Sequence, residues 1–383
     1  MKTFQGSPVN IDQPILGRIT KNYNRKWFIK EKVPSILTVV EPKANLPRMN
    51  AYIISAFLPK AINLKSPYIE GLSNEVINDL NEGDVVLLSN DGKINVFYEI
   101  NSCHNVILLT NRCNLRCIMC PQPQSTDKEN LLDFNLSLIQ MMNPDKTQNL
   151  AITGGEPTLL GEGLFKLIRT CKEYLPKTSL IILSNGKNFS DLDFTRRLAI
   201  IEHPNLVIAI PLYSDIDKTH DFIVGYPRSF YETIKGLHNL ALFRQMIEIR
   251  TVIHRFNYKR LHRFAEFVYQ NIPFAIHITF MGMETAGLAR ENVAQLWIDP
   301  YDYQCYLEKA VQYLHRANMN FSIYNHQLCI LPKKLWPFCR KSISEWKNMY
   351  LDECLSCFEK ERCGGFFKTS GNYYSRHINH LSS

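Results

Sequence analysis

Residues 111–121 read NRCNLRCIMCP and follow directly on the apolar run HNVILLT at 104–110. Cys113, Cys117 and Cys120 therefore have the spacing CxxxCxxC, in a turn at the end of an expected β-strand. With 11 cysteines among 383 residues, this three-cysteine pattern arises by chance only roughly 0.01 times in a chain of this length. The spacing therefore indicates a site for metal or redox chemistry.

The number of thiols limits which metal centre fits. Three thiolates cannot complete a tetrahedral structural zinc site, but they suit a [4Fe–4S] cluster with one iron left open. An open iron can bind and activate another molecule. The alternatives are a zinc site with a fourth ligand such as His104, or cysteines that pack as small apolar side chains.

Six apolar runs of strand length begin with this one. Longer stretches with helical spacing separate them, and together they span residues 104–318. Runs that are apolar on both faces and alternate with helices predict a parallel sheet or barrel covered by helices. The runs are HNVILLT, NLAIT, SLIILS, LVIAIPL, IEIRTVI and AIHITF.

The regions on either side have a different character. Residues 1–103 contain short β-type runs and end in DVVLLSNDGKINVFYEI, in which Asn90-Asp91-Gly92 has the composition of a hairpin turn. Residues 319–383 lose the strand and helix periodicity and hold five of the 11 cysteines. We therefore expect an N-terminal β-rich domain and a C-terminal extension held by metal.

Charge and targeting patterns exclude some classes. Lys and Arg number 44 against 36 Asp and Glu, and this net charge of +8 falls short of a nucleic-acid binder's strongly basic surface. The N-terminus has no apolar signal segment, and eighteen consecutive apolar residues occur nowhere. We therefore expect a cytoplasmic protein without a membrane partner, whose cysteines are not paired in disulfides.

The cysteine loop resembles that of the radical S-adenosylmethionine (radical SAM) enzymes, which carry CxxxCxxC after the first strand of a partial (βα)6 TIM-type barrel. Gly154-Gly155-Glu156, after the run NLAIT, looks like that family's GGE motif, which holds the cofactor's methionyl ammonium group. The resemblance implies further cofactor contacts at Ser184, Asn185 and Ser214. Met119 departs from the family, which more often has an aromatic residue there.

Candidate site residues follow the ends of all six runs, where βα barrels build their active sites. They are, in chain order, Cys113, Glu156, Asn185, Ser214, His254 and Glu284. Taken singly, His254 and Glu284 are more typical of ordinary loop residues than of catalytic acids or bases. His220 and Asp221 fit either a proton-handling pair or a helix cap. The sequence therefore assigns no catalytic residue.

The C-terminal cysteines resemble the auxiliary-cluster segment of radical SAM peptide maturases with SPASM or twitch extensions. The resemblance implies a second [4Fe–4S] cluster on Cys354, Cys357 and Cys363, with Cys329 or Cys339 as the fourth ligand. Resemblance favours Cys329, whereas spacing alone does not separate the two. A four-thiolate zinc site is the alternative.

From about residue 104 to 375 the chain resembles the radical SAM maturases of His-Xaa-Ser peptide-modification systems. The substrate would then be a small peptide or protein with His-Xaa-Ser repeats, and the chemical outcome is not carried by any residue. Five segments carry this resemblance: MGME at 281–284, LWIDP at 296–300, YNHQLC at 324–329, SISEWKN at 342–348 and CGGFF at 363–367.

The resemblance also implies a mechanism. The open iron chelates the amino and carboxylate groups of S-adenosylmethionine, and an electron from an external donor enters the sulfonium. Homolysis yields methionine and a 5′-deoxyadenosyl radical, which abstracts hydrogen from the substrate. The alternatives are RNA modification, motivated by the basic stretch at 250–263, and a zinc-stabilised scaffold; basic helices are more often solvated faces, so we do not expect a nucleic-acid partner.

Overall fold

The computed structural model describes residues 2–21, 34–40, 49–57, 64–122, 124, 131–342 and 347–381. Residues 343–346 of the SISEWKN segment lie outside these ranges. The chain divides into two compact units. Unit 1 consists of residues 1–107, 130–151 and 166–179, and unit 2 consists of residues 108–129, 152–165 and 180–383.

The N-terminal region of unit 1 forms a mixed β-sheet, which confirms the expected β-rich character. Its strand order is β1-β8-β7-β3-β4-β5-β6-β2, parallel from β3 to β6 and antiparallel elsewhere. The short helix α2 (Asn74–Asp79) begins after Ser73, whose side chain accepts the amide of Val76. The strands are β1 (Thr3–Gln5), β2 (Ser7–Val9), β3 (Ile15–Thr20), β4 (Ser35–Val39), β5 (Ala51–Ile54), β6 (Tyr68–Glu70), β7 (Val85–Leu88) and β8 (Lys93–Tyr98).

The hairpin predicted at Asn90-Asp91-Gly92 joins β7 to β8. The amide of Gly92 donates to the carbonyl of Ser89 at 3.0 Å. Gly92 has a φ of +82°, a conformation that glycine adopts without steric cost. Turn chemistry and strand pattern therefore agree.

A second sheet of eight described strands forms a parallel half-barrel with the order β16-β15-β14-β13-β12-β11-β10-β9. All six expected runs are strands, β9 to β14. Two further strands extend the sheet, and they escaped the sequence pattern because four and two residues are too short to show a period. The strands are β9 (His104–Leu108), β10 (Asn149–Thr153), β11 (Ser179–Leu183), β12 (Leu206–Pro211), β13 (Met246–Val252), β14 (His277–Met281), β15 (Phe321–Tyr324) and β16 (Cys339–Arg340).

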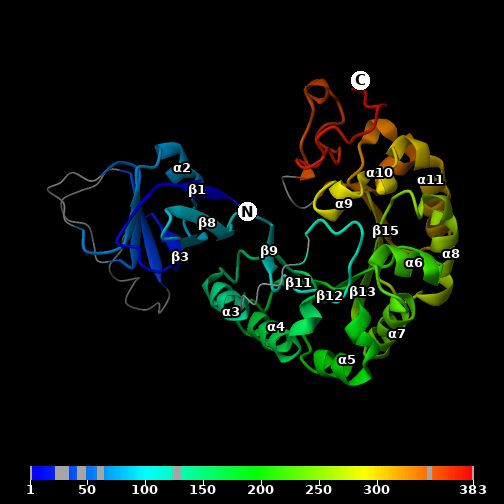
Figure 1. The fold of residues 1–383 in the computed structure, drawn as a ribbon, viewed down its shortest axis with the longest axis horizontal. Coiled ribbons are helices and arrows are strands. Elements are labelled where there is room, and N and C mark those ends of the chain that lie inside the picture. Colours follow the sequence, from blue (N-terminus) through cyan, green and yellow to red (C-terminus); the bar gives the residue numbers. More distant parts are fainter. Residues whose placement is uncertain are drawn as a thin grey trace. The chain divides into compact units, whose positions relative to one another are not determined.

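Helices alternate with these strands, and Figure 1 shows α5, α7, α8 and α11 on the outer side of the arc of strands. The longest, α11, begins at Asp299, whose side chain accepts the amide of Tyr301, with Pro300 in the first turn. The helices are α3 (Leu131–Met141), α4 (Glu162–Tyr174), α5 (Leu192–Ala199), α6 (Asp217–Val224), α7 (Ser229–Leu242), α8 (Leu261–Asn271), α9 (Leu288–Glu291), α10 (Val293–Leu296) and α11 (Pro300–Arg316).

Short 3₁₀ helices fill several connections. They are η1 (Pro157–Leu160), η2 (Lys187–Ser190), η3 (Tyr258–Arg260), η4 (Leu328–Ile330), η5 (Lys333–Phe338) and η7 (Asp352–Cys354). Among the helices that the structure describes, none has the length and apolar character needed to cross a bilayer.

The two faces of the half-barrel differ. On one face, Ile247 and Ile249 of β13 are fully buried, and Phe280 of β14 packs against Phe264 of α8. On the other face, the alternate residues of β13 and the two end residues of β14 are partly exposed, whereas Thr279 of β14 is buried. Parallel strands with helices on one side thus leave their other face, and the loops at their carboxyl ends, free to form a site.

Candidate functional site

The cysteine loop between β9 and the GGE segment is held by backbone hydrogen bonds from two helices. On one side, Leu288 at the start of α9 donates its amide to the carbonyl of Cys120 at 2.9 Å. A Cβ at Gly287 would lie 2.7 Å from that carbonyl, so only glycine lets α9 come this close. On the other side, two loop amides donate to the end of α6, Arg116 to Val224 at 2.9 Å and Ile118 to Ile223 at 3.0 Å.

The three thiols of this loop are partly buried and close to one another. Burial raises the pKa of Cys117 to about 12, and the neighbouring Cys113 and Cys120 add to the shift. Burial raises the pKa of Cys113 and Cys120 as well. Iron binds the thiolate form, so three protons must leave when the cluster binds. The positive charge of the metal must then offset the cost of burying the thiolates.

The donor set of this loop fits a cluster with an open iron. The three thiols, Cys113, Cys117 and Cys120, are partly buried and lie on one loop. Three thiolates suit a [4Fe–4S] cluster, whereas a structural zinc site needs a fourth ligand.

The Gly154-Gly155-Glu156 segment lies directly on the backbone of the cysteine loop. The amide of Gly155 donates to the carbonyl of Thr110, and that of Glu156 to the carbonyl of Arg112, both at 2.7 Å. A Cβ on Gly155 would lie 2.1 Å from the Arg112 carbonyl oxygen. The glycines are therefore needed for the close approach of these two loops.

Glu156 is completely buried, and its carboxylate accepts four hydrogen bonds from the protein. Its Oε1 accepts from the amide of Thr158 at 3.0 Å, the hydroxyl of Thr158 at 2.5 Å and the hydroxyl of Ser184 at 2.8 Å. Its Oε2 accepts from the amide of Asn185 at 2.6 Å. Burial raises the pKa of Glu156, and these hydrogen bonds oppose the increase. Glu156 thus joins the loops after β10 and β11, and a contact with an ammonium group stays a prediction.

Asn185 extends this network to the cysteine loop. Its side-chain amide donates to Oδ1 of Asn114 at 2.7 Å, one residue beyond Cys113. The structure therefore brings Cys113, Glu156, Ser184 and Asn185 into one connected group.

We predict that Glu156→Gln lowers the free energy of unfolding by about 1–3 kcal/mol, because the new NH₂ group replaces an acceptor and leaves buried donors without a partner. Chemical denaturation of the metal-free chain measures this. Glu173→Gln, at an exposed position in α4, is the matched control and should change stability by less than about 0.5 kcal/mol. Equal effects of the two substitutions would contradict the network.

Ser214 and its neighbour Tyr213 follow β12. The hydroxyl of Ser214 accepts the amide of Ile216 at 3.0 Å, a local turn contact. Burial, followed by the nearby thiols of Cys117, Cys120 and Cys113, raises the pKa of Tyr213 well above its usual value. Tyr213 therefore faces the cysteine loop, although sequence analysis singled out only Ser214. Its position directly after the fourth run is the feature that could have indicated it.

Met119 packs into an apolar cluster at the ends of β13 and β14. It is 6% exposed and contacts Ala289 and Leu296, with Val252 and Met283 packed against the same cluster. A flexible thioether fills this space where an aromatic ring is more usual in the family.

His254, after β13, is fully buried, and burial lowers its pKa to about 3. Its Nδ1 accepts the amide of Phe256 at 3.2 Å, and among the described residues its Nε2 has no partner. His220 is also buried, with its pKa lowered to about 4, whereas Asp221 accepts the amides of Arg228 and Phe230 near the start of α7. His220 and Asp221 thus have separate surroundings, and Asp221 holds the start of the next helix.

Glu284, after β14, connects the barrel to the tail. Its carboxylate lies 3.2 Å from the ammonium of Lys347 and accepts the hydroxyl of Thr369 at 3.1 Å. These contacts give Glu284 a role in holding the tail segment in place.

A polar group that was not predicted from the sequence lies on the strand face opposite the helices. Arg250 pairs with Glu248 at 3.0 Å on β13, and the hydroxyl of Thr279 on β14 donates to the same carboxylate at 2.7 Å. Glu248 and Arg250 alternate with apolar residues in IEIRTVI, and this alternation places them on the strand face opposite the helices.

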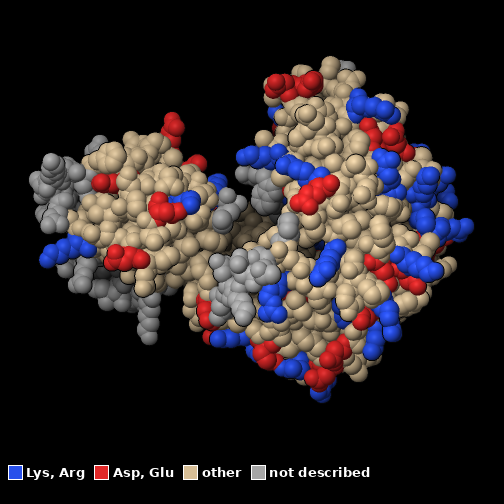
Figure 2. All heavy atoms as spheres, in the orientation of Figure 1, with Lys and Arg blue, Asp and Glu red and all other residues tan. Residues whose placement is uncertain are grey.

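The basic stretch at 250–263 is largely paired within the chain. Arg260 donates to Asp215 at 3.0 Å, and Arg263 donates to Glu266 at 2.8 Å. Arg255 donates to the carbonyl of Trp297 at 3.0 Å. Figure 2 shows Lys and Arg interspersed with Asp and Glu over α8 and α11. Little of this charge is left for a phosphate backbone.

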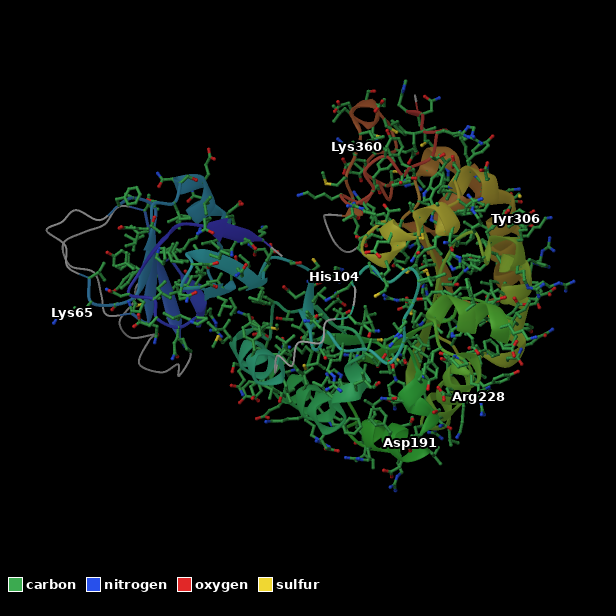
Figure 3. All side chains as sticks on the ribbon, in the orientation of Figure 1. Lys65, His104, Asp191, Arg228, Tyr306 and Lys360 are labelled. Atoms are coloured by element: carbon green, nitrogen blue, oxygen red, sulfur yellow. The ribbon has the colours of Figure 1, made fainter. Side chains whose placement is uncertain are left out.

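Four cysteines of the tail line one cavity with about 330 Å³ of empty space; Lys360, labelled in Figure 3, belongs to the same lining. The four are Cys329, Cys354, Cys357 and Cys363. Cys339 instead lines an adjacent cavity with Trp336 and Arg340, and burial raises its pKa to about 12.

A family model described as the Radical SAM superfamily matches residues 107–268, from the end of β9 through most of α8. This stretch of the chain is a radical SAM domain. A match to this family of enzymes implies a [4Fe–4S] cluster and S-adenosylmethionine, and the loop of Cys113, Cys117 and Cys120 has the donors for such a cluster.

Individual relatives of this radical SAM chain are distant. GTP 3′,8-cyclase of Campylobacter jejuni strain RM1221 is 26% identical over 275 residues, covering 67% of this chain and 83% of the relative. The sporulation killing factor maturation protein SkfB of Bacillus subtilis strain 168 is 25% identical over 139 residues, covering 35% of this chain and 31% of SkfB.

Among solved structures, Streptococcus suis SuiB bound to S-adenosylmethionine superposes with a TM-score of 0.51 at 18% identity. The superposition covers 67% of this chain and 56% of SuiB, so the chain spans just over half of that protein's length. This likeness shows the fold that the radical SAM chain adopts.

Proposed function

We propose that the chain is a radical SAM maturase that modifies a small peptide or protein of the His-Xaa-Ser type. The observation that carries this proposal is the convergence of four separate segments on one cavity. Those segments, 281–284, 296–300, 324–329 and 363–367, are four of the five by which the chain resembles the His-Xaa-Ser maturases. Each contributes at least one residue to the lining, among them Met283, Trp297, Asn325 and Phe366.

The cavity lies beside the proposed cofactor site. Met283 is part of its lining and also packs against the apolar cluster of Met119, which belongs to the cysteine loop. This apolar cluster therefore connects the lining of the cavity with the cysteine loop. The similarity to SkfB, a maturation protein of the sporulation killing factor, supports a substrate that undergoes maturation, whereas the similarity to the GTP 3′,8-cyclase of Campylobacter makes GTP the competing substrate.

The residues of the chain have distinct tasks in this proposal. The cysteine loop would hold a [4Fe–4S] cluster, and the loops joined by Glu156 would position the cofactor against it. A cluster bound there would pass one electron from an external donor to the sulfonium of S-adenosylmethionine, the chemistry that yields methionine and a 5′-deoxyadenosyl radical. Ser184, Asn185 and Ser214, as well as the GGE segment, are proposed cofactor contacts, and the tail would hold an auxiliary cluster.

The test supplies anaerobically reconstituted protein with S-adenosylmethionine, dithionite and a synthetic peptide of three His-Xaa-Ser repeats. We expect release of 5′-deoxyadenosine and a mass change in the peptide. In a parallel reaction GTP should remain unchanged. Consumption of GTP with an unmodified peptide would replace the peptide proposal by a nucleotide one, and absence of 5′-deoxyadenosine in every reaction would contradict radical SAM activity.

We propose Cys329 as the fourth ligand of the auxiliary cluster, because it lines the cavity of Cys354, Cys357 and Cys363 and Cys339 does not. Iron analysis after reconstitution should show about eight irons per wild-type chain. Cys329→Ala leaves three thiolates and one open iron, so this cluster should lose its iron to a chelator far more readily than in the wild type, whereas the matched variant Cys339→Ala should keep about eight irons under the same treatment. The reverse result would assign the ligand to Cys339, and four irons with one zinc in the wild type would indicate a zinc-bound tail.

A further inference from the structure

The cavity formed by the four converging segments is aromatic and carries no charge. It has about 450 Å³ of empty space, open to solvent. Among its described lining residues there is no Lys, Arg, Asp or Glu. Its aromatic walls come from Trp297, Tyr303, Phe366, Phe367, Tyr373 and Tyr374. Such walls favour a flat, neutral group, since a charged group would lose its hydration without gaining a partner.

One polar atom in this lining lacks a partner. Asn325 is 7% exposed, and its side-chain Oδ1 has no hydrogen bond among the described residues. Its orientation follows from the other end of the amide, because Nδ2 faces the carbonyl of Gly282 at 3.5 Å and an oxygen there would repel it. A buried acceptor without a donor is costly, so the cavity is suited to a group that brings an N–H.

The cavity also adjoins the cysteine site of the tail. Gln327 and Phe366 line both cavities, and the side-chain amide of Gln327 donates to the carbonyl of Gly365 at 2.6 Å. A ring held in the aromatic cavity would therefore lie next to the cysteine site of the tail.

We propose that this cavity binds a histidine side chain of the substrate as the neutral imidazole, which donates its N–H to Oδ1 of Asn325. An imidazole is flat and neutral above its ordinary pKa, and it carries an N–H donor for the unpartnered Oδ1 of Asn325. The proposal rests on the peptide substrate proposed above and names the part of it that the cavity recognises.

The test measures binding of N-acetylhistidine amide and N-acetylphenylalanine amide to the reconstituted chain by equilibrium dialysis at pH 8. The two probes share a flat ring, and only histidine brings an N–H donor in the ring. We expect the histidine probe to bind about tenfold more tightly or better. Saturating S-adenosylmethionine should leave this preference unchanged.

Variants at Asn325 distinguish the effect of its side-chain acceptor from the effect of its backbone conformation. Asn325 has a φ of +62°, which glycine adopts freely and aspartate tolerates. Both Asn325→Gly and Asn325→Asp lose the Nδ2 donor, and only glycine also loses the acceptor. The glycine variant should bind both probes equally, and the aspartate variant should keep the preference for histidine. Asn318→Gly is the matched control, because Asn318 is exposed and has a φ of +56°.

Three results would overturn this proposal. They are equal binding of the two probes to the wild type, a preference that survives in Asn325→Gly, and displacement of the histidine probe by S-adenosylmethionine, which would make the cavity part of the cofactor site. Release of 5′-deoxyadenosine by the wild-type preparation is measured alongside. If release occurs and the preference is absent, the cavity proposal fails while radical SAM activity stands.

Discussion

Cys117→Ala is expected to abolish release of 5′-deoxyadenosine from S-adenosylmethionine. Cys117 is the middle cysteine of the loop, between Arg116 and Ile118, whose amides both donate to the end of α6. Two thiolates cannot hold a cubane reliably, so the variant should also lose about four irons per chain. Anaerobic turnover with dithionite, followed by separation of the nucleoside products, measures the loss.

Cys305→Ala is the matched control for this loss. Cys305 is exposed on α11 and belongs to neither cysteine site. Its replacement should keep both the iron content and the rate of release. Full turnover by Cys117→Ala would show that the loop does not hold the reacting cluster.

The triple replacement of Cys354, Cys357 and Cys363 by alanine is expected to abolish peptide modification. These residues supply three of the four thiols around the tail cavity, so the variant should lose about four irons and keep the four of the barrel loop. Release of 5′-deoxyadenosine without peptide should persist, because the barrel loop and its contacts lie outside the tail. Iron analysis and peptide mass spectrometry are the two measurements.

Two outcomes bear on the role of the tail. A triple variant that keeps all its iron would remove the auxiliary cluster. A variant that loses iron and still modifies the peptide at the native rate would leave the tail as a cover for the substrate cavity.

The sequence predicted the features that depend on short-range periodicity. The six runs from HNVILLT to AIHITF are strands β9 to β14, because residues buried on both faces leave a continuous apolar pattern. The hairpin at Asn90-Asp91-Gly92 was equally predictable, since a positive φ requires a specific residue type. The cysteine loop follows the first of these strands at the expected end.

Features that depend on packing between distant segments were not predictable in this way. Nothing in the order of residues shows that the carboxylate of Glu156 is enclosed by Thr158, Ser184 and Asn185, since this enclosure arises only when the loops after two strands meet. The unpartnered oxygen of Asn325 is likewise a property of the assembled cavity. β16, with two residues, carries no pattern at all.

Gln327 and Phe366 line both cavities, so the occupants of the two cavities would contact the same two side chains. If a ring in one cavity tightens the hold on iron in the other, the iron must tighten the hold on the ring by the same factor. Loss of the tail cluster through oxidation would then first lower the affinity for substrate, while S-adenosylmethionine would still be cleaved without bound substrate. An abundant substrate would in turn protect the tail against loss of its metal.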